Sequence, residues 1–241
     1  MNREVQHTAL ITGASMGLGL ALARELARQG WHLIIDARHE DALEAARAEL
    51  AKLTTVTAIA GDVSERPHCE ALAQAAHDAG GLDTLVNNAS TLGPLPRPNL
   101  LDFPVDGLVD VFLVNVIAPL GLIQAVRDDL KPNARIINVT SDAGVEPYAG
   151  WGGYGSSKAA LEHLSAILAQ EMAKELPSMR VYWVDPGDMQ TQMQRDAFPG
   201  EDISDRGLPE DNVPGLVELL NGDYASGRYS AKAISGKAVG P

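Results

Sequence analysis

The chain has 241 residues, of which 45% are hydrophobic, and this length and composition are typical of one well-buried α/β domain. Its formal net charge of −13 argues against nucleic-acid binding, which requires clustered lysines and arginines. The 6 histidines and the single cysteine show no paired spacing of metal ligands, so we expect no metal site. Cys69 cannot form an internal disulfide, and Met1 to Gln6 lack the apolar core of a signal peptide, so we expect a cytoplasmic protein.

Strand-like apolar runs alternate along the chain with helical stretches rich in alanine and leucine. The runs lie near residues 8–12, 32–37, 55–60, 83–87, 134–140 and 180–184. Such alternation favours a parallel sheet with helices on both faces. We therefore predict an α/β fold and a single domain over residues 1–241.

A glycine-rich turn follows the first run. Residues 8–19 read Thr-Ala-Leu-Ile-Thr-Gly-Ala-Ser-Met-Gly-Leu-Gly. A helix is predicted from Leu20 to Gln29, ended by Gly30, and a second strand from Leu33 to Ile35 completes a βαβ unit. Backbone amides at a helix N-terminus attract phosphates, and missing side chains allow close approach. The turn therefore predicts a pyrophosphate site.

The longest apolar segment runs from Val105 to Val126. It contains Asp106, Asp110, Asn115 and Pro119. These residues favour a packed helix or an oligomer surface over a membrane span, so we expect no membrane contact.

Tyr154 and Lys158 are four residues apart, and Ser141 lies thirteen residues before the tyrosine. On a helix, this spacing puts the Lys158 ammonium beside the Tyr154 phenol, where a cation lowers the pKa of the phenol toward neutrality. Ser141 ends an apolar run and supplies a hydroxyl that polarises a carbonyl. A lone Tyr-x-x-x-Lys is usually a solvated helix pair, so the pattern needs support from the rest of the chain.

That support comes from several ordered motifs, which resemble the short-chain dehydrogenase/reductase family. The family's Thr-Gly-x-x-x-Gly-x-Gly matches Thr12 to Gly19, and its Asn-Asn-Ala-Gly is similar to Asn87 to Ser90, with Ser90 in place of glycine. Its serine and its Tyr-x-x-x-Lys match Ser141, Tyr154 and Lys158. The resemblance spans residues 8–193 and implies a doubly wound Rossmann fold with about seven strands.

The resemblance also implies roles for individual residues. Ser141 would hold the substrate oxygen, Tyr154 would give or take the proton, and Lys158 would bind the nicotinamide ribose as well as lower the Tyr154 pKa. Asn115 would help to hold a water that relays protons. Cofactor contacts are expected from Gly13, Ser15, Met16, Gly17, Leu18, Gly19, Asp62, Val63, Asn88, Ala89, Pro186, Gly187 and Thr191, as well as from Tyr154 and Lys158. For Asp62 and Asn88 the alternative is capping at a strand end.

Two residues at the end of the second strand point to different cofactors. Asp36 follows the glycine turn at about the sequence separation at which an acidic residue binds the ribose 2′-hydroxyl of NAD. Alignment on Gly19 and Gly30 instead puts Ala37 at the discriminating position and Arg38 where NADP-dependent relatives carry a phosphate-binding arginine. We therefore predict NADP(H) rather than NAD(H), with Asp36 turned away because alternate strand residues face opposite sides. Met16 supplies no second cation.

The end of the chain is expected to carry the substrate side. Residues 188–215 predict a substrate loop, with a plain surface loop as the alternative for its part from Ala197 to Gly215. Residues 230–241 read as a loose tail or a subunit-contact arm. Tyr148, Trp151 and Met193 line an apolar pocket or pack the core. The family resemblance also implies a homodimer or homotetramer.

The leading interpretation is an enzyme that interconverts a small-molecule carbonyl and an alcohol. The alternatives are a dinucleotide-sensing regulator on the same fold and a nucleotide-sugar epimerase or dehydratase. Dinucleotide-sensing regulators of this fold often lack the tyrosine or the lysine. Epimerases and dehydratases usually carry a larger C-terminal substrate region than the one that follows residue 193 here. The sequence does not specify the substrate.

Overall fold

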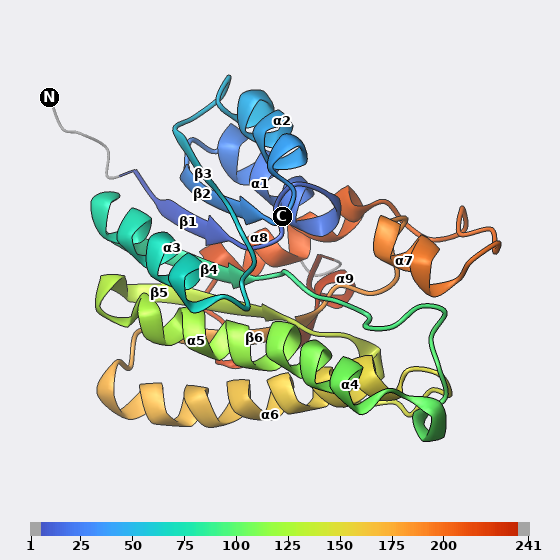
Figure 1. The fold of residues 1–241 in the computed structure, drawn as a ribbon. Helices are drawn as coiled ribbons and strands as arrows, with labels where there is room; N and C mark the ends of the chain where they lie inside the picture. The colour runs from blue at the N-terminus through green and yellow to red at the C-terminus, as the bar shows by residue number, and fades with distance from the viewer. Residues whose placement is uncertain (1–5, 236–241) are drawn as a thin grey trace, which may run out of the picture.

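Seven strands form one sheet in the order β3-β2-β1-β4-β5-β6-β7 (Figure 1). The computed structural model describes residues 6–235. Within them the strands are β1 (Thr8–Ile11), β2 (His32–Ala37), β3 (Val56–Ala60), β4 (Leu82–Asn87), β5 (Leu130–Val139), β6 (Arg180–Asp185) and β7 (Gly227–Ser230). Every neighbouring pair is parallel, which confirms the doubly wound sheet expected from the sequence. The order reverses between β1 and β4, and such a switch point leaves a crevice at the carboxyl ends of the strands.

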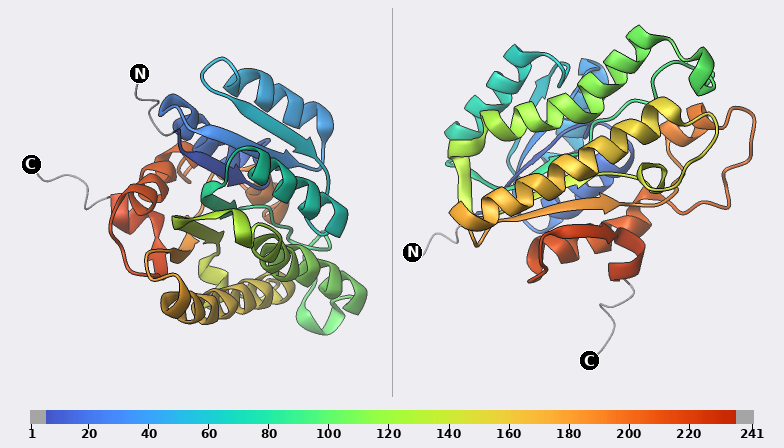
Figure 2. Two further views of the ribbon diagram at one scale, coloured as in Figure 1. Left: turned by 90° about the vertical axis from the view of Figure 1, so that its left-hand side faces the viewer. Right: turned by 90° about the horizontal axis from the view of Figure 1, so that it is seen from below.

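Helices cover both faces of the sheet (Figure 2). One face carries α1 (Gly17–Arg28), α2 (Glu40–Leu50), α8 (Val213–Asn221) and α9 (Ala231–Ser235). The other carries α3 (Arg66–Asp78), α5 (Ala118–Ala125) and α6 (Gly152–Glu175), with α4 (Val105–Phe112) leading into α5. The short α7 (Gln192–Ala197) lies between β6 and α8.

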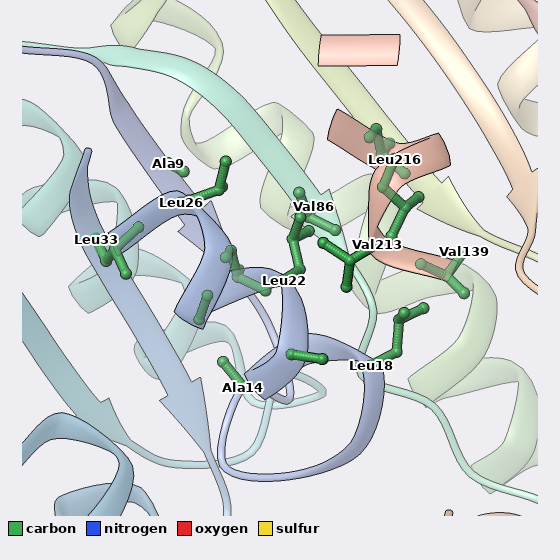
Figure 3. Packing of buried hydrophobic residues seen from close by; sticks show 14 of the residues in the cluster. Ala9, Ala14, Leu18, Leu22, Leu26, Leu33, Val86, Val139, Val213 and Leu216 are labelled. Atoms are coloured by element: carbon green, nitrogen blue, oxygen red, sulfur yellow. The ribbon is translucent and has the colours of Figure 1, made fainter. Parts of the chain in front are cut away.

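The two cores follow from the alternation of side chains along each strand. Ile11 packs into the core beneath α1, whereas Leu10 before it packs into the core beneath α3. On α1, Leu22 and Leu26 recur at helical spacing and are buried between the sheet and α8 (Figure 3). Each fully buried leucine contributes about 2 kcal/mol. The helix is followed by Gly30, whose positive φ of 79° suits the residue after a C-cap.

The apolar segment that begins at Val105 is one long helix interrupted by a π-helical turn. The turn spans Leu113–Ile117 and joins α4 to α5. By length and composition, Val105–Ala125 also qualifies as a candidate membrane span, the single one within residues 6–235. It packs against α3 and α6 and contains the buried Asn115, so the prediction of a packed helix is confirmed. The oligomer surface stays a prediction.

The C-terminal part of the chain differs from its prediction. Ser230 ends β7, and residues 231–235 form α9 with Ala231 and Ile234 buried against α8. A loose tail is therefore wrong for residues 230–235, because two apolar side chains suffice to dock this short helix. Residues 236–241 lie outside the described residues. The predicted substrate loop is also partly helical, since it contains α7 and the start of α8.

Candidate active site

A cavity of about 740 Å³ lies at the carboxyl edge of the sheet. The segments that follow β1 to β6 all contribute to its wall. Of the predicted site residues, all but Gly19 and Asn115 line it. A crevice at this edge is where open α/β sheets bind ligands.

The glycine turn has the shape of a phosphate cradle. Gly13 and Gly17 have φ of 65° and 57°, a conformation that side chains disfavour. A Cβ on Gly19 would lie 2.5 Å from the Gly13 carbonyl oxygen, so the turn closes only around a bare glycine. α1 begins at Gly17 and directs its free amides toward the turn. These residues fit the pyrophosphate of a dinucleotide.

Asn88 braces this turn from β4. Its side-chain amide donates to the carbonyl oxygens of Thr12 at 2.8 Å and Gly13 at 3.1 Å. The Thr12 hydroxyl in turn accepts from the amides of Asn88 and Ala89, both at 3.0 Å. The Asn88 side chain therefore performs the structural role considered in the sequence, and a ribose contact stays a prediction.

Asp62 lies in the turn that follows β3 and leads to α3. Its carboxylate accepts from the amide of Ser64 at 2.8 Å and from its hydroxyl at 2.7 Å. Burial raises the pKa of Asp62, but these hydrogen bonds and the nearby Arg38 charge outweigh it and leave the pKa below its ordinary value. Asp62 and Val63 both line the cavity.

Asp36 and Arg38 point to different environments. Asp36 is 1% exposed, and its carboxylate accepts from the Gly13 amide at 2.7 Å, under the turn. Arg38 is exposed and lines the cavity together with Ala37. Asp36 is also among the residues that line the cavity, so its turning away from the cofactor stays a prediction.

Tyr154 lies near the start of α6 and is 8% exposed. Burial raises the pKa of its phenol well above the ordinary value, while hydrogen bonding with Ser141 and Ser90 lowers it. The charges of Asp185 and Asp142 raise it further. Ser90, the departure from the family motif, thus reaches the Tyr154 phenol.

Lys158 lies one turn further along α6. Its Nζ is 5.4 Å from the centre of the Tyr154 ring and donates to the Val139 carbonyl at 2.8 Å. Burial lowers the pKa of Lys158 to about 7. The predicted proximity is confirmed, but the predicted net lowering of the Tyr154 pKa is wrong, because burial dominates and disfavours the charged form of both side chains.

Ser141 is the second residue after β5, which ends at Val139. Its hydroxyl donates to Asp142 Oδ1 at 2.9 Å. Its carbonyl accepts from Arg228 of β7 at 3.3 Å. Arg228 also donates to Glu162 of α6 at 3.0 Å, so it joins three elements behind the serine. No motif in the sequence pointed to Arg228.

Asn115 lies in the π-helical turn, a distortion often found at functional sites. Its amide nitrogen donates to the Thr91 carbonyl and the Ser157 hydroxyl, and its oxygen accepts from the Thr91 amide and the Ser90 hydroxyl. All four positions of the side-chain amide are used. The proton-relay water that the family resemblance assigns to Asn115 stays a prediction.

The loop after β6 closes another side of the cavity. Asp185 accepts from the Gly187 amide at 2.8 Å and orients Pro186-Gly187. Thr191 caps α7 by accepting from the Gln194 amide at 3.2 Å. The Cβ that a side chain at Gly17 would carry lies 3.6 Å from the Thr191 methyl, so α7 abuts the glycine turn.

Aromatic side chains form the wall beyond Tyr154. Trp151, Met193 and Phe198 pack around the buried cluster that contains Tyr154 and Ala197. Trp151 and Met193, like Tyr148, line the cavity. Trp151 and Met193 therefore both line the pocket and pack in the core, which were the two possibilities considered from the sequence. The sequence patterns singled out Met193 but not the nearby Phe198, so only the structure identifies Phe198 as part of this wall.

Arg97 lies against this wall. Its guanidinium carbon is 3.8 Å from the centre of the Trp151 ring and 5.1 Å from that of Phe198. Its Nε and Nη2 donate to the Ala197 carbonyl at 3.1 and 2.8 Å. Burial lowers the pKa of Arg97. No pattern in the sequence predicted this contact.

The sequence matches a family model described as short chain dehydrogenase over residues 7–202. The chain belongs to the short-chain dehydrogenase family. It is therefore an oxidoreductase that uses a nicotinamide cofactor, as the resemblance implied.

Three relatives illustrate this membership. General stress protein 39 of Bacillus subtilis is 33% identical, over 83% of this chain and 69% of that protein. Benzil reductase ((S)-benzoin forming) of Saccharomyces cerevisiae is 33% identical, over 78% and 73%. A protein provisionally described as a short chain dehydrogenase from Shigella flexneri, solved with NADP, is 29% identical with a TM-score of 0.86, over 94% of this chain and 97% of that one.

Proposed function

We propose that the protein is an NADP(H)-dependent oxidoreductase that interconverts a carbonyl compound and an alcohol through Ser141, Tyr154 and Lys158. The observation that carries the proposal is that these three side chains share one cavity with the glycine turn. A bound nicotinamide supplies or accepts hydride in this chemistry. The remaining steps are proton transfers and hydrogen bonds made by the chain.

Tyr154 is the proton donor in the reducing direction. Because its pKa is raised, the phenol keeps its proton at neutral pH and is ready to protonate a carbonyl oxygen. The Ser141 hydroxyl polarises the same oxygen when its hydrogen turns from Asp142 to the substrate. Lys158, with a pKa of about 7, is suited to return a proton to the phenol side of the site.

Arg38 supports the preference for NADP(H). It is exposed on the cavity wall directly after β2, whereas Asp36 is committed to the Gly13 amide. A guanidinium there pairs with a ribose 2′-phosphate. The neighbour solved with NADP supports the same choice.

The cofactor proposal is tested by comparing kcat/KM for NADPH and NADH. We expect NADPH to be preferred, and Ala37→Asp combined with Arg38→Ile to reverse the ratio. A wild-type protein that prefers NADH would contradict the role of Arg38.

The reaction is tested with both reduced cofactors and a panel of ketones, followed by the loss of nicotinamide absorbance. Benzil belongs in the panel because of the benzil reductase relative and because Trp151 and Phe198 offer aromatic surfaces. We expect turnover that depends on Tyr154. Binding of NADPH with no turnover of any ketone or alcohol would favour a dinucleotide sensor instead.

A further inference from the structure

Asp36 has a buried carboxylate with both oxygens bound. Oδ1 accepts from the Gly13 amide at 2.7 Å, and Oδ2 lies 2.9 Å from Nε2 of His68. The backbone carbonyl of Asp36 also accepts from the Ala14 amide at 2.9 Å. Asp36 therefore holds the first residues of the glycine turn by both its backbone and its side chain.

His68 reaches Asp36 from the first turns of α3. Its side chain is 7% exposed, and the imidazole lies so close to Gly61 that a Cβ on this glycine would overlap the ring. Gly61 and the adjacent Asp62 line the cavity. The His68 ring thus lies between the support of the glycine turn and the cavity wall that follows β3.

The pair explains how a carboxylate is tolerated in this position. A buried carboxylate that loses its partner is strongly destabilising, because its lost hydration is then uncompensated. Asp36 is 1% exposed and His68 is 8% exposed, so both depend mainly on protein partners for their hydrogen bonds. An apolar residue at position 36 would fill the same space but would leave the Gly13 amide without its acceptor.

We propose that Asp36 and His68 are positioning residues of the dinucleotide site: Asp36 holds the Gly13 amide, and His68 holds Asp36. This proposal rests on the proposed function for its ligand but not for its geometry. The pair acts on the pyrophosphate turn, which NADP and NAD share, while Arg38 acts on the 2′-phosphate that NADP alone carries. Loss of the pair and loss of Arg38 therefore have different signatures.

The first test is binding of NADPH and NADH, measured by fluorescence on purified protein. We expect Asp36→Ala and His68→Leu to weaken both dinucleotides by the same factor, about tenfold or more, since each removes a hydrogen bond to a buried charge. Asp36→Asn and His68→Gln keep a hydrogen-bonding group and should remain within about threefold of wild type. Arg38→Ala should weaken NADPH alone.

His77→Gln is the matched control, because His77 lies on the same helix and bonds to a carboxylate, Asp129, but has a side chain that is 71% exposed. It should leave both affinities unchanged. Selective loss of NADH in Asp36→Ala would overturn the proposal and make Asp36 a ribose ligand. Wild-type affinity for both dinucleotides in folded Asp36→Ala and His68→Leu would also overturn it.

Hydrogen exchange of residues 8–19 separates this proposal from the proposed function, since it needs no cofactor. We expect faster exchange in this segment in His68→Leu, and near wild-type exchange in His68→Gln and His77→Gln. If the exchange results are as expected but the wild-type protein binds neither dinucleotide, the support of the glycine turn by Asp36 and His68 would stand and the proposed NADP(H)-dependent function would be wrong. If His68→Leu does not fold, Asp36→Ala decides, because it removes the acceptor of the Gly13 amide directly. Wild-type protection of the turn and wild-type binding of both dinucleotides in this folded variant would overturn the proposal.

Discussion

The glycine turn is shaped by its backbone, whereas the wall formed by Arg97, Trp151 and Phe198 is shaped by its side chains. In the turn, positive φ and the close approach of Gly13 and Gly19 determine the geometry. In the wall, a guanidinium stacks on two rings and donates to a carbonyl 100 residues away. The cofactor side therefore depends on local glycine geometry that Asp36 and Asn88 brace from elsewhere in the chain, whereas the substrate side depends on long-range side-chain contacts alone.

This difference leads to different tolerance of substitution. Few other residues fit a glycine turn that binds a pyrophosphate, because a side chain at Gly13 or Gly19 would clash with backbone atoms. A wall of stacked side chains can be built from many combinations of residues with similar energy, since aromatic rings and cationic side chains repack against one another. We therefore expect changes on the cofactor side to abolish binding and changes on the substrate side to alter which carbonyl is accepted.

Tyr154→Phe should have the largest effect, because it removes the group on which both sides of the cavity converge. The expected loss of kcat is about a hundredfold or more, since the variant has no acid or base at the substrate oxygen. Affinity for NADPH should stay within severalfold, because the ring still fills its place in the aromatic cluster. Near-normal kcat on a confirmed substrate would remove Tyr154 from the chemistry.

Gly19→Val should affect the cofactor side alone. The branched side chain meets the Gly13 carbonyl and the Asn88 amide, so we expect NADPH affinity to fall by about tenfold or more while circular dichroism stays near that of wild type. Gly121→Ala is the matched control, since a Cβ at Gly121 of α5 meets no atom within 4 Å. Unchanged NADPH binding in folded Gly19→Val would separate the turn from the site.

Arg97→Ala should affect the substrate side alone and by less. Loss of the Ala197 hydrogen bonds and the ring stacking loosens the end of α7, so we expect KM for an aromatic ketone to rise severalfold, or about 1 kcal/mol. The NADPH affinity should not change. A fall in NADPH affinity equal to the rise in KM would show that the two sides are not independent.

These two sides also differ in how far the sequence predicted them. The pattern from Thr8 to Gly19 identified the first strand, the turn and the start of α1, because spacing within a short segment determines all three. Ser141, Tyr154 and Lys158 came from motifs that the family shares, and the structure brings them together. The six placed strands are confirmed, whereas β7 had no expected position.

The remaining features depend on tertiary contacts that no local pattern encodes. The net rise in the Tyr154 pKa comes from burial, which periodicity does not measure, so spacing alone predicted the opposite direction. Arg97 and His68 are single residues without a motif, and their partners lie on other elements. The short α9 was missed because only two of its residues are apolar and buried.

Lys158→Met should change how the stability of the protein depends on pH. The folded pKa of Lys158, about 7, lies below its unfolded value, so the unfolded chain binds more protons between these values. The destabilisation by the buried lysine is complete below pH 7 and decreases as the pH rises. The melting temperature of the variant relative to wild type should therefore be more favourable at pH 6 than at pH 9. A difference independent of pH would contradict a lowered pKa.

The most direct measurement of the central claim is hydride transfer itself. Wild-type protein would be incubated with NADPH deuterated at the transferable position and with the ketone panel, and the alcohols would be analysed by mass spectrometry. We predict one deuterium at the carbinol carbon, and about a hundredfold less labelled alcohol or lower still in the same time with Tyr154→Phe, although both proteins bind NADPH. Bound NADPH without deuterium in any product, from the wild-type protein, would contradict the assignment of this cavity to carbonyl reduction.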